Sequence, residues 1–400
     1  MNRWASACLV FVVLAGCSDP LQSSVSIAES DSSSTVTSLL AGGSTSTSST
    51  SSSSTTVTWV VPDESEPIPL GPLAPREGAS VVWTGYEMVV WGGCEDRYCK
   101  TRFADGAAYD PITNRWRMIA DSPLEGRNYH LTTWTGSEMI IVGGTQSNRT
   151  AAAYMPSTDS WRLLPDTPFA VGYERLDGSV LRDYVGAVWT GTGYIIWSPH
   201  VDRVSAYSPE TDSWADMAST GLEVDLGVLR WNGTDLVALG ALTAVYPNPV
   251  PLQGVRLVDQ KWEALPSASL RDDRYNIGAR PHLSGWAGDA LVTFTDSGSE
   301  AGRTMTYSGA ENSWTQIDSV PLPGSEAWPE PLPIGERLLV FHYGGAAIYD
   351  PASGWLKANS PYAEAGRAVW TGQEVLFWGY GTTDTGSFEM RAWRFTPPSP

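Results

Sequence analysis

Lysine and long apolar runs are both scarce in this sequence of 400 residues. Lysine occurs only at Lys100, Lys261 and Lys357, so arginine supplies most of the positive charge. The formal net charge is −19, and a surface of that sign repels phosphate backbones. The apolar run from Ala5 to Ala15 is too short to cross a bilayer, which needs about 20 residues. The sequence therefore predicts neither a nucleic-acid partner nor a membrane-spanning segment.

Motifs of known catalysts are missing as well. No glycine-rich phosphate loop or nucleophile elbow occurs, and no motif selects an acid–base pair from the 44 acidic residues. The few histidines are scattered along the chain, at His130, His200, His282 and His342. We therefore predict no metal and no cofactor. These absences leave the question of catalysis open, but they favour a protein that is not an enzyme.

The first 16 residues have the pattern of an export signal. Arg3 supplies the positive end, the apolar run follows, and Leu14-Ala15-Gly16-Cys17 looks like a bacterial lipobox. We predict a lipoprotein signal peptide over residues 1–16, with a diacylglycerol on the Cys17 thiol. The alternative is an ordinary secretory signal with a chance cysteine. The prediction places the mature protein outside the cytoplasm, anchored to the bacterial cell membrane by its lipid.

A tract rich in serine and threonine separates this signal from the rest of the chain. The tract covers residues 18–58 and is almost pure Ser/Thr from Ser44 to Thr58, so it has little apolar mass to bury. We predict that residues 17–58, which begin with the lipidated cysteine, form a disordered linker. Its expected role is to hold the following domain away from the membrane, either at a Gram-positive surface or in a periplasm.

From residue 59 onward, short apolar runs alternate with turn residues, which is the pattern of antiparallel strands. Tryptophan marks this pattern twice in most units, at intervals of about 50 residues. We predict that these periodic residues pack between sheets rather than form a sugar-binding stripe. The first set opens a turn, and the second closes the unit: Trp83, Trp134, Trp189, Trp231, Trp286 and Trp370, then Trp116, Trp161, Trp214, Trp262, Trp314 and Trp355.

A repeat of this length, with a Gly-Gly pair, a tyrosine and a tryptophan per unit, resembles the kelch β-propeller family. The resemblance rests on Gly92-Gly93, Tyr109-Asp110-Pro111 and the tryptophans, and it covers residues 59–400. It implies an all-β fold, a seven-bladed β-propeller of kelch type whose blades are small antiparallel sheets. Seven turn glycines count the blades: Gly85, Gly136, Gly191, Gly233, Gly288, Gly335 and Gly372.

The last unit has no closing tryptophan, because the chain ends at Pro400, whereas Trp59-Val60-Val61 is left over at the other end. We predict that this N-terminal strand completes the last blade and covers an edge that would otherwise recruit other chains. The alternative is that Trp59 belongs to the linker and that the ring has six and a half blades.

Two cysteines remain in the exported protein, Cys94 and Cys99, because Cys8 leaves with the signal peptide and Cys17 carries the lipid. One close pair in an exported protein predicts a disulfide that closes a small loop. Metal binding by the Cys-x4-Cys spacing is the alternative, although no histidine lies nearby in the sequence.

Basic residues recur just before the first strand of several units. If the units superpose, these side chains ring the mouth of the central channel, where a carboxylate, a sulfate or an acidic sugar would bind. Arginine at this point is also part of the kelch pattern, so the alternative is that each arginine pairs with a carboxylate of the next blade or caps backbone carbonyls. The predicted ligand-binding residues are Arg76, Arg127, His130, Arg182, Asp183, Arg280, His282 and Arg367.

Together these features predict a non-catalytic binding module for an envelope protein or a glycan, expected to be a monomer. The kelch resemblance also implies enzyme alternatives. One is a carbohydrate-active enzyme that epimerises an acidic sugar at an arginine-rich mouth. The other is a radical-copper oxidase, which needs a Cys-linked tyrosine and two histidines, so the scattered histidines argue against it. A purely structural scaffold in the envelope is a further alternative.

Overall fold

The computed structural model describes residues 65–95, 99–144, 148–172, 174–176, 179–181, 185–242, 252–268, 283–294, 304–321, 331–342, 345–358, 365–382 and 388–398. By its internal contacts the chain divides into Met1–Thr56 and Val57–Pro400, and every described residue belongs to the second unit. The predicted signal peptide, Cys17 and the Ser/Thr linker lie outside the described residues. In the described part, no helix is both long and apolar enough to pass through a lipid bilayer.

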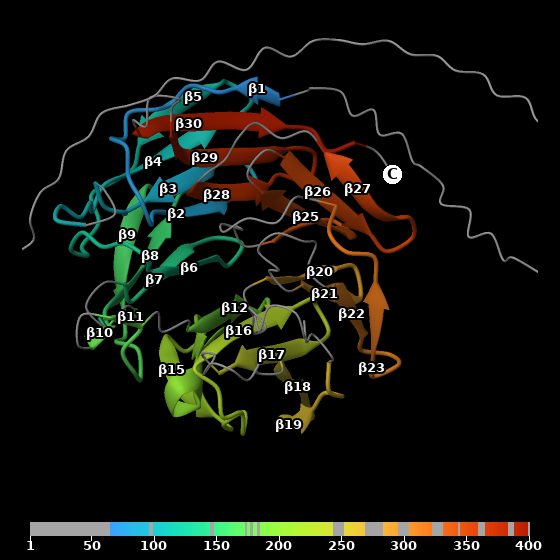
Figure 1. Ribbon diagram of the computed structural model, residues 1–400. Coiled ribbons are helices and arrows are strands. Elements are labelled where there is room, and N and C mark those ends of the chain that lie inside the picture. Colours follow the sequence, from blue (N-terminus) through green and yellow to red (C-terminus); the bar gives the residue numbers. More distant parts are fainter. Residues whose placement is uncertain are drawn as a thin grey trace, which may run out of the picture. The chain divides into compact units, whose positions relative to one another are not determined.

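The strands form seven four-stranded antiparallel sheets, which are the blades of a propeller (Figure 1). This arrangement confirms the predicted all-β, seven-bladed fold. Within blades 1 to 4 the strands follow one another along the chain, and the first strand of each blade is the innermost. Blade 1 contains β2 (Ser80–Trp83), β3 (Met88–Trp91), β4 (Gly106–Asp110) and β5 (Arg115–Met118); blade 2 contains β6 (Leu131–Trp134), β7 (Met139–Val142), β8 (Ala151–Met155) and β9 (Ser160–Leu164); blade 3 contains β12 (Gly186–Trp189), β13 (Tyr194–Ser198), β14 (Arg203–Ser208) and β15 (Ser213–Met217); blade 4 contains β16 (Leu226–Trp231), β17 (Leu236–Ala241), β18 (Gln253–Val258) and β19 (Lys261–Ala264).

The remaining blades continue the ring, and the last one takes its outer strand from the other end of the chain. A separate hairpin lies between blades 2 and 3, and a short 3-10 helix, η1 (Pro199–Val201), lies inside blade 3. The hairpin is β10 (Glu174–Leu176) with β11 (Ser179–Leu181); blade 5 contains β20 (Ser284–Ala287), β21 (Ala290–Phe294), β22 (Thr304–Ser308) and β23 (Ser313–Ile317); blade 6 contains β24 (Leu332–Ile334), β25 (Arg337–His342), β26 (Gly345–Asp350) and β27 (Gly354–Ala358); blade 7 contains β28 (Ala365–Trp370), β29 (Val375–Thr382), β30 (Phe388–Phe395) and β1 (Ser65–Pro67).

The ring is closed by β1, which pairs antiparallel with β30 (Figure 1). Its register places Glu66 opposite Arg394, and the Arg394 guanidinium lies 3.0 Å from the Glu66 carboxylate. The next residue, Ile68, donates its backbone N–H to Ala392 at 3.0 Å and is buried. Closure by an N-terminal strand is therefore confirmed. The strand that pairs with β30 is Ser65–Pro67, whereas the expected Trp59-Val60-Val61 lies outside the described residues. Backbone pairing and the burial of Ile68 hold this polar segment in place.

The turn between the first two strands explains the repeated glycine. In blade 1, the Thr84 hydroxyl accepts a hydrogen bond from the Glu87 backbone N–H at 2.9 Å, and Gly85 between them has a φ of 96°. That left-handed conformation strains any residue with a Cβ, so glycine is the residue that the turn requires. All seven turn glycines that were used to count the blades have positive φ values.

A separate apolar cluster fills each of the seven junctions between neighbouring blades. The cluster between blades 7 and 1 joins Trp378 and Leu376 to Met88 and Tyr109, all of which are at most 2% exposed. Each blade therefore buries both faces of its sheet against neighbours, so no blade has a complete core of its own. The cohesion of the ring is spread over these junctions rather than concentrated in one centre.

The closing tryptophans tie each blade to the one before it. Trp161, on the outer strand of blade 2, packs against Tyr154 and donates its indole N–H to the Ala120 carbonyl, just after blade 1, at 2.9 Å. The closing tryptophans are half-buried or buried and border the junction clusters. This position agrees with the prediction that they pack between sheets. The same donation to the preceding blade occurs at Trp116, Trp214, Trp262, Trp314 and Trp355.

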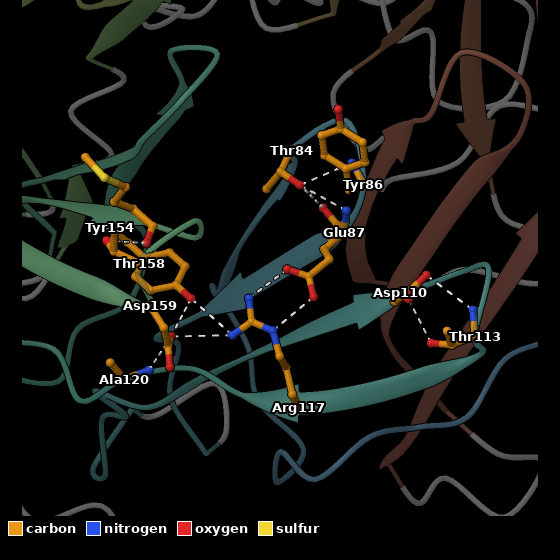
Figure 2. A network of polar contacts seen from close by, with 11 residues as sticks. Thr84, Tyr86, Glu87, Asp110, Thr113, Arg117, Ala120, Tyr154, Thr158 and Asp159 are labelled. Carbon is orange, nitrogen blue, oxygen red and sulfur yellow. Dashed lines mark hydrogen bonds and ion pairs between the residues drawn. The ribbon is translucent and has the colours of Figure 1, made fainter.

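One end of the ring carries the turns between the first and second strands, and we call it the turn end. Here Arg117, on β5, donates to both carboxylate oxygens of Glu87 at 2.9 and 2.7 Å (Figure 2). Its remaining nitrogen reaches blade 2, where the Tyr154 hydroxyl lies 3.3 Å away and the Asp159 carboxylate 3.4 Å away. Hydrogen bonds from Tyr154 and the Ala120 backbone, together with the Arg117 charge, lower the pKa of Asp159.

The same arrangement recurs between blades 2 and 3. Arg162, on β9, donates to both carboxylate oxygens of Glu138 at 2.9 and 2.8 Å. It also approaches the Tyr207 hydroxyl at 3.3 Å and the Asp212 carboxylate at 3.0 Å. We call these two networks, centred on Arg117 and Arg162, the arginine clamps. Because each one links an acid of its own blade to a tyrosine of the next, the clamps join blades without burying an unpaired charge.

Candidate functional site

The opposite end of the ring, which we call the loop end, carries the segments that lead into the first strands. These strands neighbour one another around the ring axis, with β2 lying between β28 and β6 (Figure 1). Because the blades are antiparallel sheets, the loops between second and third strands lie at the same end. The loop end therefore gathers strand ends from every blade, and loops on a rigid scaffold are the usual place for a binding site.

Arg76 holds the corner of blade 1 at the loop end. Its side chain is buried and donates to the backbone carbonyls of Ala74 at 3.0 Å and Gly92 at 3.2 Å. The same guanidinium lies 2.7 Å from the Asp105 carboxylate and stacks over the Phe103 ring, with 4.2 Å to its centroid. The predicted alternative of carbonyl capping describes these contacts well, because the guanidinium N–H groups point at protein acceptors.

Arg127 repeats this role in blade 2. Its nitrogens donate to the carbonyls of Glu125 at 3.1 Å, Gly143 at 2.8 Å and Thr150 at 3.3 Å, and to the Thr150 hydroxyl at 3.1 Å. Burial lowers the pKa of Arg127. The sequence spacing correctly placed Arg76 and Arg127 at equivalent positions of two blades. In the structure, both fasten the segment before the first strand to the Gly-Gly corner after the second.

The other predicted ligand-binding residues are distributed unevenly. Arg367, near the start of β28, is exposed. His130 lies beside Arg127, just before β6. Four of the predicted residues fall outside the described residues: Arg182, Asp183, Arg280 and His282.

His130 is a buried, neutral imidazole. It is 7% exposed, its Nε2 lies 2.9 Å from the Ser80 hydroxyl, and its ring meets the edge of Trp91 at 5.0 Å between centroids. Burial, followed by the positive charges of Arg127 and Arg367, lowers the pKa of His130 to about 3. Among the described residues, no hydrogen-bond partner meets its Nδ1. The Ser80–His130 contact therefore lacks the orienting carboxylate that a catalytic serine–histidine pair ordinarily has.

Two residues at the loop end were not predicted, Glu77 and Tyr129. Both side chains are half-buried, and the Tyr129 hydroxyl donates a hydrogen bond to the Glu77 carboxylate. Tyr129 has a φ of 52°, a left-handed conformation that is uncommon for a bulky residue. Their positions in the sequence, directly after Arg76 and directly before His130, were the available signal. The contact itself joins two blades and could not be found by comparing spacings.

The predicted disulfide is present between Cys94 and Cys99, in the loop between β3 and β4, with the two Cα atoms 5.0 Å apart. This loop supports the Glu77 segment directly. The Glu77 and Cys94 backbones exchange two hydrogen bonds, both at 2.8 Å. The Asn128 side-chain amide lies 2.8 Å from the Cys99 sulfur. The disulfide loop therefore contacts Glu77 itself and Asn128, which directly precedes Tyr129.

Comparisons with known proteins add little to this description. No protein-family model matches the chain, and no curated protein matches it. A solved structure titled "Structure of YjhT" is similar over 73% of this chain and 99% of that chain, with 13% sequence identity and a TM-score of 0.45. A likeness this weak carries no argument about the roles of particular residues. The class of the protein, a seven-bladed β-propeller, follows from its own sheets.

Proposed function

We propose that this protein is an extracytoplasmic propeller, held at the bacterial cell membrane by a lipid on Cys17, that binds a protein or glycan partner without transforming it. The observation that carries the proposal is one place where the repeat is broken. At the loop end of blades 1 and 2, the Glu77–Tyr129 pair and the Cys94–Cys99 disulfide depart from the repeated pattern. Such departures on a rigid scaffold are where binding sites ordinarily lie.

The residues predicted from the sequence remain part of the proposal in two different roles. Arg367 is exposed at the loop end, so we propose it as a direct ligand contact. The proposal extends to Arg182, Asp183, Arg280 and His282 on sequence grounds alone. For Arg76, Arg127 and His130, which are buried, the proposed contribution is to hold the loop corners that present the ligand contacts.

A binding screen tests this function. The full mature chain with Cys17→Ser, which removes the lipid, is offered a panel of glycans and, separately, an envelope extract for affinity capture. We expect one glycan class or one specific envelope protein to be retained, and Arg367→Gln to weaken that binding if the ligand is anionic. Loss of binding in an Arg127 variant would not be informative, because this buried side chain holds the fold. A chain that retains nothing from either source contradicts the proposal.

The membrane anchor has its own test. Cells producing the unmodified chain should hold it in the membrane fraction, whereas Cys17→Ser should release it, since two or three acyl chains supply the anchoring free energy. Mass spectrometry of the mature amino terminus identifies the lipid. Equal distribution of both proteins between the fractions would contradict the anchor.

The enzyme alternative predicts turnover rather than retention. Acidic sugars would be epimerised at the loop end, where an exposed cation and a carboxylate–hydroxyl pair are both present. The same glycan panel, followed by detection of altered products, distinguishes this activity from simple binding.

A further inference from the structure

The segments before the first strands of blades 1 and 2 align residue by residue in the sequence, from Arg76 and Arg127 onward. In this alignment Gly78 corresponds to Tyr129, and both backbones are left-handed, with φ values of 66° and 52°. Glycine adopts that conformation without strain, whereas tyrosine does so at a cost. Backbone geometry alone therefore favours glycine at position 129. The presence of tyrosine indicates that its side chain has a role that offsets this cost.

The Tyr129 side chain is directed at one carboxylate. Its hydroxyl donates to Oε1 of Glu77, and its ring lies against the Gly78 backbone. Within the described residues, no donor meets the second oxygen of Glu77 and no cation forms an ion pair with it, since Arg76 pairs with Asp105 instead. A carboxylate accepts several hydrogen bonds, so the half-buried Glu77 keeps acceptor capacity at the loop end.

The pair is also held in place before any ligand arrives. Two backbone hydrogen bonds fix Glu77 to Cys94, and the Cys94–Cys99 disulfide closes the loop that carries this contact. The Tyr129 backbone N–H donates to the Gly78 carbonyl at 2.9 Å. Groups that are already positioned lose little conformational freedom on binding, which favours affinity.

We propose that Glu77 and Tyr129 form a subsite for the hydroxyl groups of a neutral sugar, a proposal that rests on the binding function proposed above. The Tyr129 hydroxyl holds one oxygen of the Glu77 carboxylate, and the second oxygen accepts hydrogen bonds, so the pair matches the O–H donors of a sugar. A carboxylate or phosphate ligand would meet the negative charge of Glu77 at this point. The neighbouring His130 stays neutral and adds no compensating charge. The ligand class is therefore an uncharged, hydroxyl-rich glycan.

The test uses the full mature chain with Cys17→Ser and an array of neutral and acidic oligosaccharides, followed by titration calorimetry with the best binder. Glu77→Gln removes the charge, and Tyr129→Phe removes the hydroxyl. Tyr129→Gly removes the whole side chain and introduces a residue that adopts the left-handed backbone without strain. Glu125→Gln is the matched control, because Glu125 is exposed and lies just before Arg127. We expect a neutral glycan to bind, with affinity at least tenfold weaker in Glu77→Gln and in Tyr129→Gly and severalfold weaker in Tyr129→Phe. The control should bind as the unmodified chain does.

Melting curves distinguish loss of contacts from loss of structure, and Tyr129→Gly is the variant that should stay folded while losing affinity. A chain that binds only acidic glycans, only an envelope protein, or a neutral glycan with unchanged affinity in the folded Glu77 and Tyr129 variants overturns the subsite and leaves the binding function standing. A chain that binds nothing from the array or from an envelope extract overturns both.

Discussion

The two ends of the ring use arginine in opposite ways. At the turn end, the Arg117 side chain is 37% exposed. It binds one carboxylate of its own blade, and a carboxylate and a tyrosine of the next blade. At the loop end, Arg127 is 4% exposed, and its described hydrogen bonds go to backbone carbonyls and a threonine of its own blade. The first kind of contact joins blades, and the second shapes the loops within a blade. For Arg117 and Arg127, recurrence in the sequence therefore marks architecture, whereas the ligand contacts proposed above are a separate set.

The clamps also show how a repeat preserves a contact while its residues change places. In blade 4, Glu263 occupies the outer-strand position that arginine holds in blades 1 and 2, and the arginine is its cross-strand partner, Arg256. From there Arg256 lies 3.7 Å from Asp235, the acid of that blade's turn. At the loop end, by contrast, Gly78 of blade 1 corresponds to Tyr129 of blade 2, and no exchange of positions preserves a shared contact. The turn end keeps this interaction in blades 1, 2 and 4, whereas the loop end differs between blades 1 and 2, which is why we place the binding site at the loop end.

Removing the closing strand should have the largest effect, because both ends depend on an intact ring. A chain that starts at Arg76 lacks β1 and Ile68 and exposes the edge of β30. We expect it to aggregate or to melt far below a chain that starts at Val57, as measured by size-exclusion chromatography and circular dichroism. Equal melting temperatures would show that the ring does not need this strand.

The next largest effect should come from the loop-end arginine. Arg127→Met leaves the buried Gly143 carbonyl without this donor and removes the hydrogen bonds from Arg127 to Thr150, whose carbonyl keeps the Gly143 backbone N–H. The change should cost about 3 kcal/mol of unfolding free energy. Urea denaturation measures this loss. A stability unchanged within error would indicate that Arg127 is available to a ligand, in which case the loop end would bind anions through it.

The two ends of the ring should also differ in the pH range over which their titratable groups lower the free energy of unfolding. His130 has a folded pKa of about 3, below its ordinary value of about 6.5, so the unfolded chain binds an extra proton between these values. Stability should therefore fall as pH drops below about 6.5, by at most about 1.4 kcal/mol per pH unit. At the turn end, Asp159 has a lowered pKa, so its contribution to the stability of the fold is lost only as pH falls below about 4.

The control for that experiment is His130→Asn, which should remove the slope between pH 6.5 and 4.5 and keep the acid loss below pH 4. Unfolding free energies from urea denaturation at several pH values provide the comparison. Parallel curves for the two proteins would mean that His130 titrates in the folded chain much as it does in the unfolded one.

The smallest effect should come from the turn-end clamp. Arg117→Met removes a partly exposed guanidinium, so we expect a loss of about 1 kcal/mol, which is less than at Arg127. Arg203, which pairs with Asp216 on the same blade and is more exposed, is the control, and Arg203→Met should cost less again. A larger loss at Arg117 than at Arg127 would reverse the ranking of the two ends.

Much of the fold was predictable because its signals are local and repeated. Gly85 and the other turn glycines require left-handed backbones, so they counted the blades correctly, and the close spacing of Cys94 and Cys99 predicted their disulfide. The site was less predictable. Arg76 and Arg127 were found by spacing, but whether a guanidinium meets a ligand or a carbonyl depends on which atoms the fold brings within reach.

The sequence by itself determined that this chain repeats a short-strand unit seven times and closes on itself, because periodic tryptophan and glycine constrain each unit in the same way. Only the tertiary structure decided which segment closes the ring and that Tyr129 of one blade meets Glu77 of another. Those contacts join residues far apart in the chain, so they follow from the geometry of neighbouring blades and leave no periodic trace in the sequence.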